Sequence, residues 1–455
     1  MRGVTSSIDR EVLLVYPPFE EPLRRGGRYY TSLPLGIAYI ASVLERAGLR
    51  VTTVDCNIDC WSVDRLAQEI IRAKPAVLGI SVTSPGIRYA KRLIEEVRAG
   101  GGTSDIMRIA VGGPHVGADP SSASVLQADA YFCGEAEFKF LEYCLGISGG
   151  KCIPTSITAV KPAHDLDSLP YPARHLFAEP KYRFTPLSAS RGCPFSCIYC
   201  GMAGTKYRRR GIDGIRGEIE SLRTKSVDFV DDVFTLDKDY ASAISSIMKE
   251  NGLKWACTTR VDLVDERLLG VMAESGCRHV SFGVESGSER LRRLAGKQVS
   301  NKEVATAFRA CREAGIPTRA FVMVGLPTET SKELDETFDF VNSLGPDEVL
   351  YTPTIIYPGT MLMEYCLHHG LVSPSAWRDY AMGCGPMPVS LPEGMSIEEV
   401  NCRIFDESTR FYMTLPKILS RMGDAQCLED VIDAIAALGA LITEPLMGKG
   451  RIITP

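Results

Sequence analysis

The sequence predicts an α/β chain in which a doubly wound parallel sheet precedes a partial barrel of six strand–helix units. Short apolar runs rich in Val and Ile alternate with segments of helical period, and this alternation occurs twice. Strands that alternate with helices form parallel sheets covered by helices. A proline-containing stretch at 151–181 separates the two series. We therefore divide the chain into an α/β domain (1–150), a linker (151–184), a partial barrel (185–385) and a mostly helical C-terminal segment (386–455).

The first series predicts a five-stranded sheet. Its strands are expected at Val12–Tyr16, Val51–Asp55, Val77–Ser81, Ile109–Gly112 and Ala130–Phe132. Its helices are expected at Leu35–Ala47, Val63–Ala73, Ile87–Ala99, Ser122–Leu126 and Phe138–Leu145. Ligands of such sheets bind beyond the carboxyl ends of the strands, so the loops that follow the strands are candidate binding loops.

The second series predicts the partial barrel, whose active site belongs at the C-terminal strand ends. Its strands are expected at Leu187–Ser190, Phe229–Val233, Lys254–Thr258, His279–Gly283, Thr318–Val324 and Glu348–Ile355. Its helices are expected at Gly214–Arg223, Tyr240–Asn251, Glu266–Ser275, Asn301–Ala314 and Lys332–Leu344.

Composition indicates a globular enzyme. Of 455 residues, 45% are hydrophobic and 24% charged, and the net charge of −5 gives no reason to expect a nucleic-acid partner. The start of the chain is polar, and no apolar run approaches the ~20 residues of a membrane span. Fifteen cysteines without a signal segment favour a reducing compartment, hence the cytoplasm.

Three of those cysteines form one motif, Cys193, Cys197 and Cys200, spaced Cys-x₃-Cys-x₂-Cys. A [4Fe–4S] cluster takes one thiolate per iron, so three thiolates leave the fourth iron open to a ligand. The alternatives are a structural zinc site and three unrelated thiols. Zinc prefers four ligands in paired halves, and no second pair follows at that spacing. The other cysteines are expected to fill the core, and a second cluster from Cys384, Cys402 and Cys427 is disfavoured because their spacing is too open.

The cysteine loop, directly after the first barrel strand, resembles that of the radical S-adenosylmethionine (SAM) enzymes, and the resemblance covers about 187 to 360. It implies that the open iron chelates the amino and carboxylate groups of SAM. It also implies that an electron, from a donor such as flavodoxin or ferredoxin, cleaves SAM to a 5′-deoxyadenosyl radical.

The same resemblance suggests SAM contacts at successive strand ends. Tyr199 matches the aromatic position that packs on adenine, and the other positions follow later strands. The alternatives are helix caps, surface ion pairs and ordinary turns. The predicted SAM-binding residues are Tyr199, Asp231 and Asp232 (amino group), Arg260 (carboxylate), Glu285 and Ser286 (ribose or methionine part) and Gly325 (adenine).

The first domain resembles the cobalamin-binding domain found ahead of radical SAM barrels. The sequences Pro34-Leu35-Gly36, Gly112-Gly113-Pro114-His115 and Gly134-Glu135-Ala136-Glu137 carry the resemblance. Glycines let the backbone approach a macrocycle closely, and hydroxyls suit the amide groups of a corrin. The predicted cobalamin contacts are Pro34, Leu35, Gly36, Ser81, Thr83, Ser84, Gly112, Gly113, Pro114, His115, Gly134 and Glu135.

One motif of many corrinoid proteins is missing. Asp55-Cys56-Asn57-Ile58-Asp59 stands where Asp-x-His-x-x-Gly would supply the cobalt ligand, so the lower ligand is not expected from that motif. His115 is an alternative ligand, but a bond from this loop histidine to the backbone is favoured. A five-stranded parallel domain that binds a nucleotide, or no ligand, is the alternative. No Gly-x-Gly-x-x-Gly follows the first strand, which disfavours a dinucleotide.

Together these features predict a cobalamin-dependent radical SAM methyltransferase that methylates an unactivated carbon of a small-molecule substrate. A cyclase or rearrangement enzyme without methyl transfer is one alternative, and a non-catalytic corrinoid-binding protein is another. No catalytic residue is assigned. Five side chains near the C-terminus would either close the cavity or simply pack, and packing is favoured: Trp377, Arg378, Tyr380, Phe411 and Tyr412.

Overall fold

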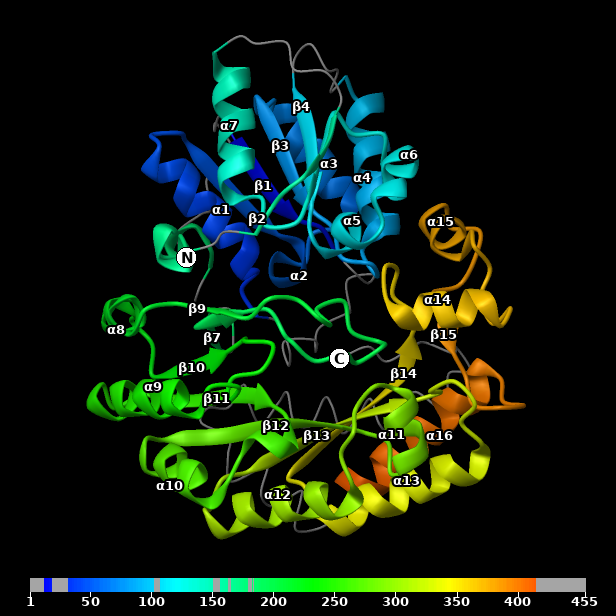
Figure 1. The fold of residues 1–455 in the computed structure, drawn as a ribbon. Helices are drawn as coiled ribbons and strands as arrows, with labels where there is room; N and C mark the ends of the chain where they lie inside the picture. The colour runs from blue at the N-terminus through cyan, green and yellow to red at the C-terminus, as the bar shows by residue number, and fades with distance from the viewer. Residues whose placement is uncertain are drawn as a thin grey trace.

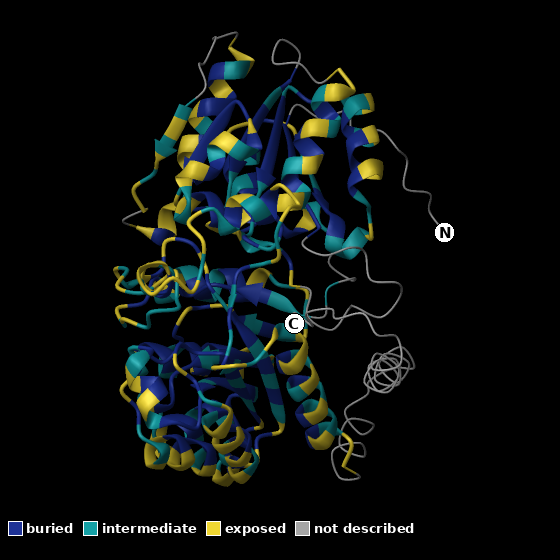
Figure 2. Ribbon diagram, turned by 90° about the vertical axis from the view of Figure 1, so that its right-hand side faces the viewer, coloured by how far each residue is buried: buried dark blue, intermediate teal, exposed yellow. Residues whose placement is uncertain are grey.

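The computed structural model describes residues 12–18, 32–101, 107–149, 156–162, 165–178, 182 and 184–414. They form two stacked α/β units, an N-terminal sheet with its helices above and a curled barrel sheet below (Figure 1). Buried strands run through both units, and the exposed residues gather on the outer helices (Figure 2). Within these ranges, no helix is both long and apolar enough to cross a bilayer.

The N-terminal sheet has the strand order β2-β1-β3-β4-β5-β6, and all its pairings are parallel. Because β2 and β3 flank β1, the strand order reverses direction at β1, and ligands of such sheets bind at this kind of reversal. The strands are β1 (Val12–Tyr16), β2 (Val51–Asp55), β3 (Val77–Ser81), β4 (Arg108–Gly112), β5 (Ala130–Cys133) and β6 (Ser156–Ala159).

Both faces of this sheet are covered. Side chains alternate along β1, so that Val12 and Leu14 pack on one side while Leu13 and Val15 pack on the other. The first side is covered by α1 (Leu35–Arg46) and α7 (Glu137–Ser148), and the second by α3 (Val63–Ala73) and α4 (Ile87–Ala99). The short helices are α2 (Cys56–Asp59), α5 (Pro114–Ala118) and α6 (Ala123–Leu126). The predicted doubly wound sheet is confirmed.

The predicted count of five strands is wrong, because β6 in the predicted linker pairs with β5 as a sixth strand. Its residues alternate between half-buried and exposed, and Ile157 is 55% exposed. A four-residue edge strand with no buried face carries no apolar run, so its sequence resembles a loop.

The second sheet has the order β15-β14-β13-β12-β11-β10-β7, and all strands are parallel except β15. Helices line its outer face (Figure 1), which gives the predicted partial barrel. The strands are β7 (Thr185–Leu187), β10 (Ser226–Phe229), β11 (Lys254–Thr259), β12 (Cys277–Glu285), β13 (Thr318–Val324), β14 (Glu348–Ile355) and β15 (Val389–Ser390). The helices are α8 (Ile212–Ser221), α9 (Lys238–Glu250), α10 (Glu266–Glu274), α11 (Glu289–Leu294), α12 (Asn301–Glu313), α13 (Ser331–Leu344) and α16 (Ile397–Tyr412).

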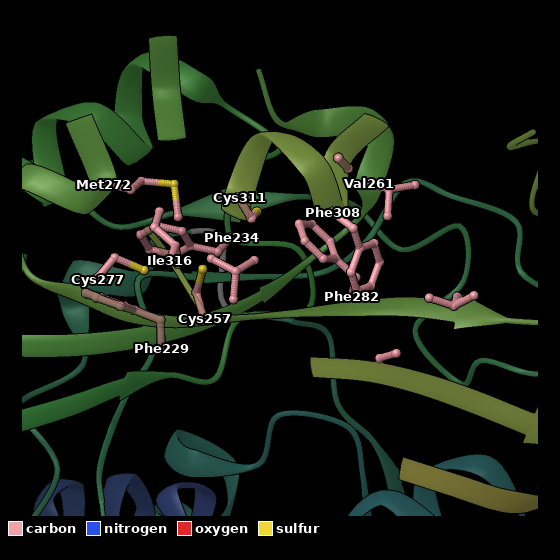
Figure 3. Close-up of a cluster of buried hydrophobic side chains, with 14 of the residues drawn as sticks. Phe229, Phe234, Cys257, Val261, Met272, Cys277, Phe282, Phe308, Cys311 and Ile316 are labelled. Atoms are coloured by element: carbon pink, nitrogen blue, oxygen red, sulfur yellow. The ribbon is translucent and has the colours of Figure 1, made fainter. Parts of the chain in front are cut away.

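The barrel core is apolar and includes cysteines. Figure 3 shows Cys257, Cys277 and Cys311 among Phe, Ile and Met side chains between strands and helices. All three belong to the buried core, as expected for cysteines that act as small apolar residues. The expectation that the other cysteines fill the core is wrong for three of them, because Cys60, Cys384 and Cys402 are exposed.

The first two barrel strands end earlier than predicted. β7 stops at Leu187 because Ser190–Arg191 pairs instead with Arg208–Arg209, as the antiparallel strands β8 and β9. β10 stops at Phe229 because the next residues turn toward this ladder, where the Asp231 carboxylate accepts hydrogen bonds from it.

The chain after β14 packs against the N-terminal unit through α14 (Met361–His368) and α15 (Ala376–Ala381) (Figure 1). Trp377 and Tyr380 belong to the apolar core of the first unit, and the Tyr380 hydroxyl donates to the Pro85 carbonyl at 2.8 Å. The segment predicted to be mostly helical from 386 also contributes β15 to the barrel sheet, and its residues 415–455, Cys427 among them, lie outside the described ranges.

Candidate active site

The three-cysteine loop leaves the barrel at the strand ends, where its backbone is held tightly. Gly192 has φ +94° and donates its N–H to Asp232 at 2.9 Å. A side chain at Gly192 would overlap the carbonyl of Lys206, so only glycine fits. Cys193 N–H donates to the Thr205 hydroxyl at 2.9 Å. These bonds fix the backbone at the first cysteine and at the residue before it.

The three thiols belong to the loop between β8 and β9 and differ in burial. Cys193 is buried, whereas Cys197 and Cys200 are half-buried. An Nη of Arg260 lies 3.9 Å from the Cys197 sulfur, and the same guanidinium stacks 3.9 Å from the Phe195 ring centre. A positive charge beside the loop would stabilise the negatively charged thiolates. Among the described residues no three His, Cys, Asp or Glu side chains converge to hold one metal ion. A [4Fe–4S] cluster takes one thiolate per iron, so its ligands need not meet at a single ion.

Asp231 and Asp232 hold the cysteine loop. Asp231 accepts from the backbone N–H of Ala189 at 3.1 Å and from the Ser190 hydroxyl. Burial raises the pKa of Asp231 to about 6. Asp232 accepts from Gly192, as above. Both carboxylates therefore have structural bonds, and their contact with SAM stays a prediction.

Glu285 also bonds to the cysteine loop. Its Oε1 accepts from the Tyr199 hydroxyl at 2.8 Å and from Lys297 Nζ at 2.9 Å. Ser286 is fully buried and its hydroxyl bonds to the Thr337 hydroxyl at 3.0 Å, and its contact with SAM stays a prediction. Gly325 has φ +92°, and a side chain there would overlap the Ser390 carbonyl of β15.

Arg260 is also bound within the protein. Its Nε and Nη2 donate to the two oxygens of Asp262, both at 2.9 Å. This two-point pair leaves Nη1 directed at the Cys197 sulfur. An anion at the cysteine loop would meet this nitrogen.

In the first unit, three predicted cobalamin residues, Gly113, His115 and Ser84, are engaged inside the protein. Gly113 has φ +100°, and a side chain there would lie 2.6 Å from the Val82 nitrogen, so protein backbone rather than a ligand takes that space. His115 Nδ1 bonds to the buried Ser84 hydroxyl at 2.9 Å, which replaces the expected backbone bond. Burial lowers the pKa of His115 to about 4.

The imidazole of His115 packs against Trp377 of α15, in the segment that follows β14. The ring centres of His115 and Trp377 are 5.6 Å apart, and His115 Nε2 is buried without a hydrogen-bond partner among the described residues. Trp377 itself donates its indole N–H to the Ile356 carbonyl at 2.8 Å. The packing role favoured for Trp377 and Tyr380 agrees with their burial in the core of the first unit. Phe411 is buried in the barrel core instead.

Other predicted cobalamin residues leave room for a ligand. Gly36, exposed in the first turn of α1, has no atom within 4 Å of the position a side chain would take. Pro34 and Leu35, beside it, are half-buried, as are Ser81 at the end of β3 and Thr83 after it. Gly134, in contrast, has φ +116°, and a side chain there would lie 2.7 Å from the Val160 carbonyl oxygen, so protein backbone takes that space. This open helix start at the carboxyl edge of the sheet fits a large cofactor.

Four charged side chains join that edge to the cysteine loop. Arg191, next to Gly192, pairs with Glu137 at 2.9 Å and with Glu135 at 3.2 Å. Arg208 of β9 pairs with Glu135 as well. Because the glutamates follow β5 and Arg191 lies in β8, between barrel strand β7 and the cysteine loop, the carboxyl edge of the N-terminal sheet faces the cysteine loop. Glu135 is thereby engaged by protein, and its contact with cobalamin stays a prediction.

Sequence reasoning missed Lys297 and the ion pair that Glu137 makes with Arg191. Lys297 is a single lysine in a loop, and nothing in its local sequence marks it as buried. Glu137 lies two residues after the predicted contact Glu135, and in the first turn of α7 an acidic residue is common and gives no sign of an ion pair. Its partner Arg191 is distant in sequence, and only the fold brings the two together.

Residues 187–341 match the model of the radical SAM superfamily, and residues 26–143 match that of the B12 binding domain. The chain is a radical SAM enzyme with a B12-binding domain. The [4Fe–4S] cluster and SAM accordingly belong to the barrel and cobalamin to the N-terminal unit. The cysteine loop and the open start of α1 fit these groups.

Curated relatives extend over most of the chain. An uncharacterized methyltransferase of Pyrococcus horikoshii is 28% identical, covering 90% of this chain and 94% of the relative. The cytidylyl-2-hydroxyethylphosphonate methyltransferase of Streptomyces wedmorensis is 27% identical, covering 81% and 84%. The anaerobic magnesium-protoporphyrin IX monomethyl ester cyclase of Rubrivivax gelatinosus is 26% identical, covering 84% and 74%.

Solved structures share the fold. The cobalamin-dependent SAM radical enzyme OxsB has a TM-score of 0.71 at 14% identity, covering 95% of this chain and 71% of that one. The radical SAM methyltransferase TsrM of Kitasatospora setae has a TM-score of 0.64 at 18% identity, covering 79% and 76%.

Proposed function

We propose that the chain is a C-methyltransferase that transfers a methyl group to an unactivated carbon of a small molecule. The observation that carries the proposal is the meeting of two strand-end edges, pinned by Glu135 and Glu137 against Arg191 and Arg208. A methyl carrier on one edge and a radical source on the other would share one space.

At the barrel edge, Cys193, Cys197 and Cys200 would each bind one iron of the cluster. Arg260 would meet the carboxylate of SAM with the nitrogen that now lies at the Cys197 sulfur. Tyr199 would hold its ring against adenine while its hydroxyl stays bonded to Glu285. When bound, the cofactors would supply a carbon-centred radical able to remove a hydrogen atom and a methyl group able to replace it.

At the other edge, Pro34, Leu35 and Gly36 would border the corrin, because the space beside Gly36 is open. The chain lacks the usual histidine motif after β2. There, Asp55 instead caps α2 and accepts from the Tyr182 hydroxyl at 2.9 Å. Cobalt would therefore be held without a histidine from that motif.

The two methyltransferase relatives support transfer of a methyl group. Anaerobically reconstituted protein, reduced chemically or by flavodoxin or ferredoxin, should form 5′-deoxyadenosine from SAM. With a candidate substrate and SAM carrying a deuterated methyl group, the product should retain the label on carbon. The Cys193→Ala variant should form no 5′-deoxyadenosine, and undiminished formation would refute the proposal.

A cyclase is the second candidate, favoured by the similarity to the Rubrivivax gelatinosus cyclase over 84% of this chain. Product mass separates the two. A methylation adds one CH₂ unit, whereas an oxidative cyclisation or a rearrangement adds no carbon. A product without added carbon, formed together with 5′-deoxyadenosine, would replace the first proposal by the second.

A further inference from the structure

A buried lysine stands at the rim of the barrel without an assigned role. Lys297 lies in the loop after α11 and is only 4% exposed. Its ammonium group donates to the Gly283 carbonyl at 2.6 Å and to Glu285 Oε1 at 2.9 Å. Lysine is almost never buried unless it is paired, so this position is specified by the two acceptors on β12.

Gly283 on β12 leaves room for the Lys297 side chain. A side chain at Gly283 would lie 2.6 Å from Lys297 Nζ and would overlap the Glu285 carboxylate, so glycine leaves the room they occupy. Glu285 itself has φ +64°, in the left-handed region that non-glycine residues rarely adopt. Such strain persists where surrounding contacts hold it, and it gathers at ligand sites.

The two carboxylate oxygens of Glu285 have different surroundings. Oε1 accepts both from Lys297 and from the Tyr199 hydroxyl, whereas Oε2 takes no hydrogen bond from any described residue. Tyr199 stands between the second and third cysteines of the motif. An open carboxylate oxygen beside the cysteine loop is an acceptor for a hydroxyl or ammonium donor.

We propose that Lys297 is a positioning residue for SAM, which neutralises Glu285 and turns its open oxygen toward the ribose hydroxyls or the amino group of that molecule. The inference rests on the proposed function. Lys297 would act through Glu285, and through it on the Tyr199 ring. Removal of the ammonium would release the carboxylate from its fixed geometry and weaken SAM binding without touching a cysteine.

The test measures SAM binding rather than turnover. Cobalamin-loaded, iron–sulfur-reconstituted protein is kept oxidised so that SAM is not consumed, and its dissociation constant is measured by equilibrium dialysis. Lys297→Met should weaken SAM binding on the order of 10- to 100-fold, as loss of a supporting partner does. Lys297→Arg, which keeps the charge, should restore most of the affinity, and Lys302→Met at an exposed site of α12 should leave it unchanged.

Two results would overturn the inference: unchanged SAM affinity in Lys297→Met, or equal weakening in Lys297→Arg and Lys297→Met. Should Lys297→Met lose iron, Glu285→Gln provides the second test. It keeps the shape but weakens the acceptor, and it should lower SAM affinity at unchanged iron content, whereas unchanged affinity would overturn the inference. Wild-type protein that holds iron but binds no SAM would instead refute the proposed function, and this inference with it.

Discussion

Gly296 offers a sharp test of how the barrel supports the cysteine loop. It has φ +76°, and the adjacent Ala295 carbonyl accepts from the Ile198 N–H at 3.0 Å. An alanine methyl at Gly296 would overlap the Ser196 carbonyl oxygen and lie 3.1 Å from its carbon. Relief requires a shift of the loop by about 1 Å, since carbon contacts settle near 3.5 Å or beyond.

Gly315 is the matched control. It also follows a barrel helix with positive φ, +70°, but has no atom within 4 Å of an added methyl group. Both alanine variants pay about 1–2 kcal/mol of backbone strain, and only Gly296→Ala moves the loop.

The assay is 5′-deoxyadenosine formation by anaerobically reconstituted, reduced protein, together with iron content and melting temperature. A displacement of about 1 Å at reacting groups costs on the order of 100-fold in rate. Gly296→Ala should lose about that much or fail to retain iron, whereas Gly315→Ala should lose only stability. Equal rates in the two variants would refute the reasoning, because the contact with Ser196 would then have no consequence for the site.

Three further substitutions test other parts of the structure. Arg191→Met leaves Glu137 without its partner at 2.9 Å. Because the pair is partly exposed, we expect the free energy of unfolding to fall by only about 2 kcal/mol in denaturant titrations, and an unchanged midpoint would contradict this. Trp377→Ala removes an indole that is 3% exposed and should cost about 3–5 kcal/mol and quicken proteolysis between the units, and wild-type resistance would argue against that packing. Burial raises the pKa of Glu329 from 4.5 to about 7, so folding retains a proton that the unfolded chain loses. Wild-type stability should therefore fall as pH rises from about 5 to about 7, and Glu329→Gln should remove up to about 3 kcal/mol of that fall; parallel pH profiles would exclude the effect.

Long apolar strands could be predicted from the sequence, and short polar ones could not. β13 and β14 begin and end where their Val- and Ile-containing runs predict. β6, β8, β9 and β15 are two to four residues long and lie at edges or outside the main sheets, so no apolar period marks them. Their pairing depends on neighbours brought together by the fold.

The candidate site likewise has features that follow from local sequence and features that depend on the fold. The cysteine loop is predictable because its ligands are adjacent in sequence and their spacing has a chemical reason. The pairs of Arg191 with Glu137 and of Lys297 with Glu285 join different elements, and no local pattern connects their members. A glycine such as Gly113 indicates that another group comes close to its backbone, but the sequence does not show which group. In the structure that group is the backbone of Val82, not a ligand.

The most direct test of the account is whether cobalamin and the cluster share one space between the two strand-end edges. Electron paramagnetic resonance of the anaerobic protein, with cobalt as Co(II) and the cluster reduced, reports this through the magnetic coupling of the two centres. We expect the Co(II) signal to be split or broadened by the reduced cluster and to return to its simple form in Cys193→Ala. Co(II) and cluster spectra that add as independent signals would contradict the shared site.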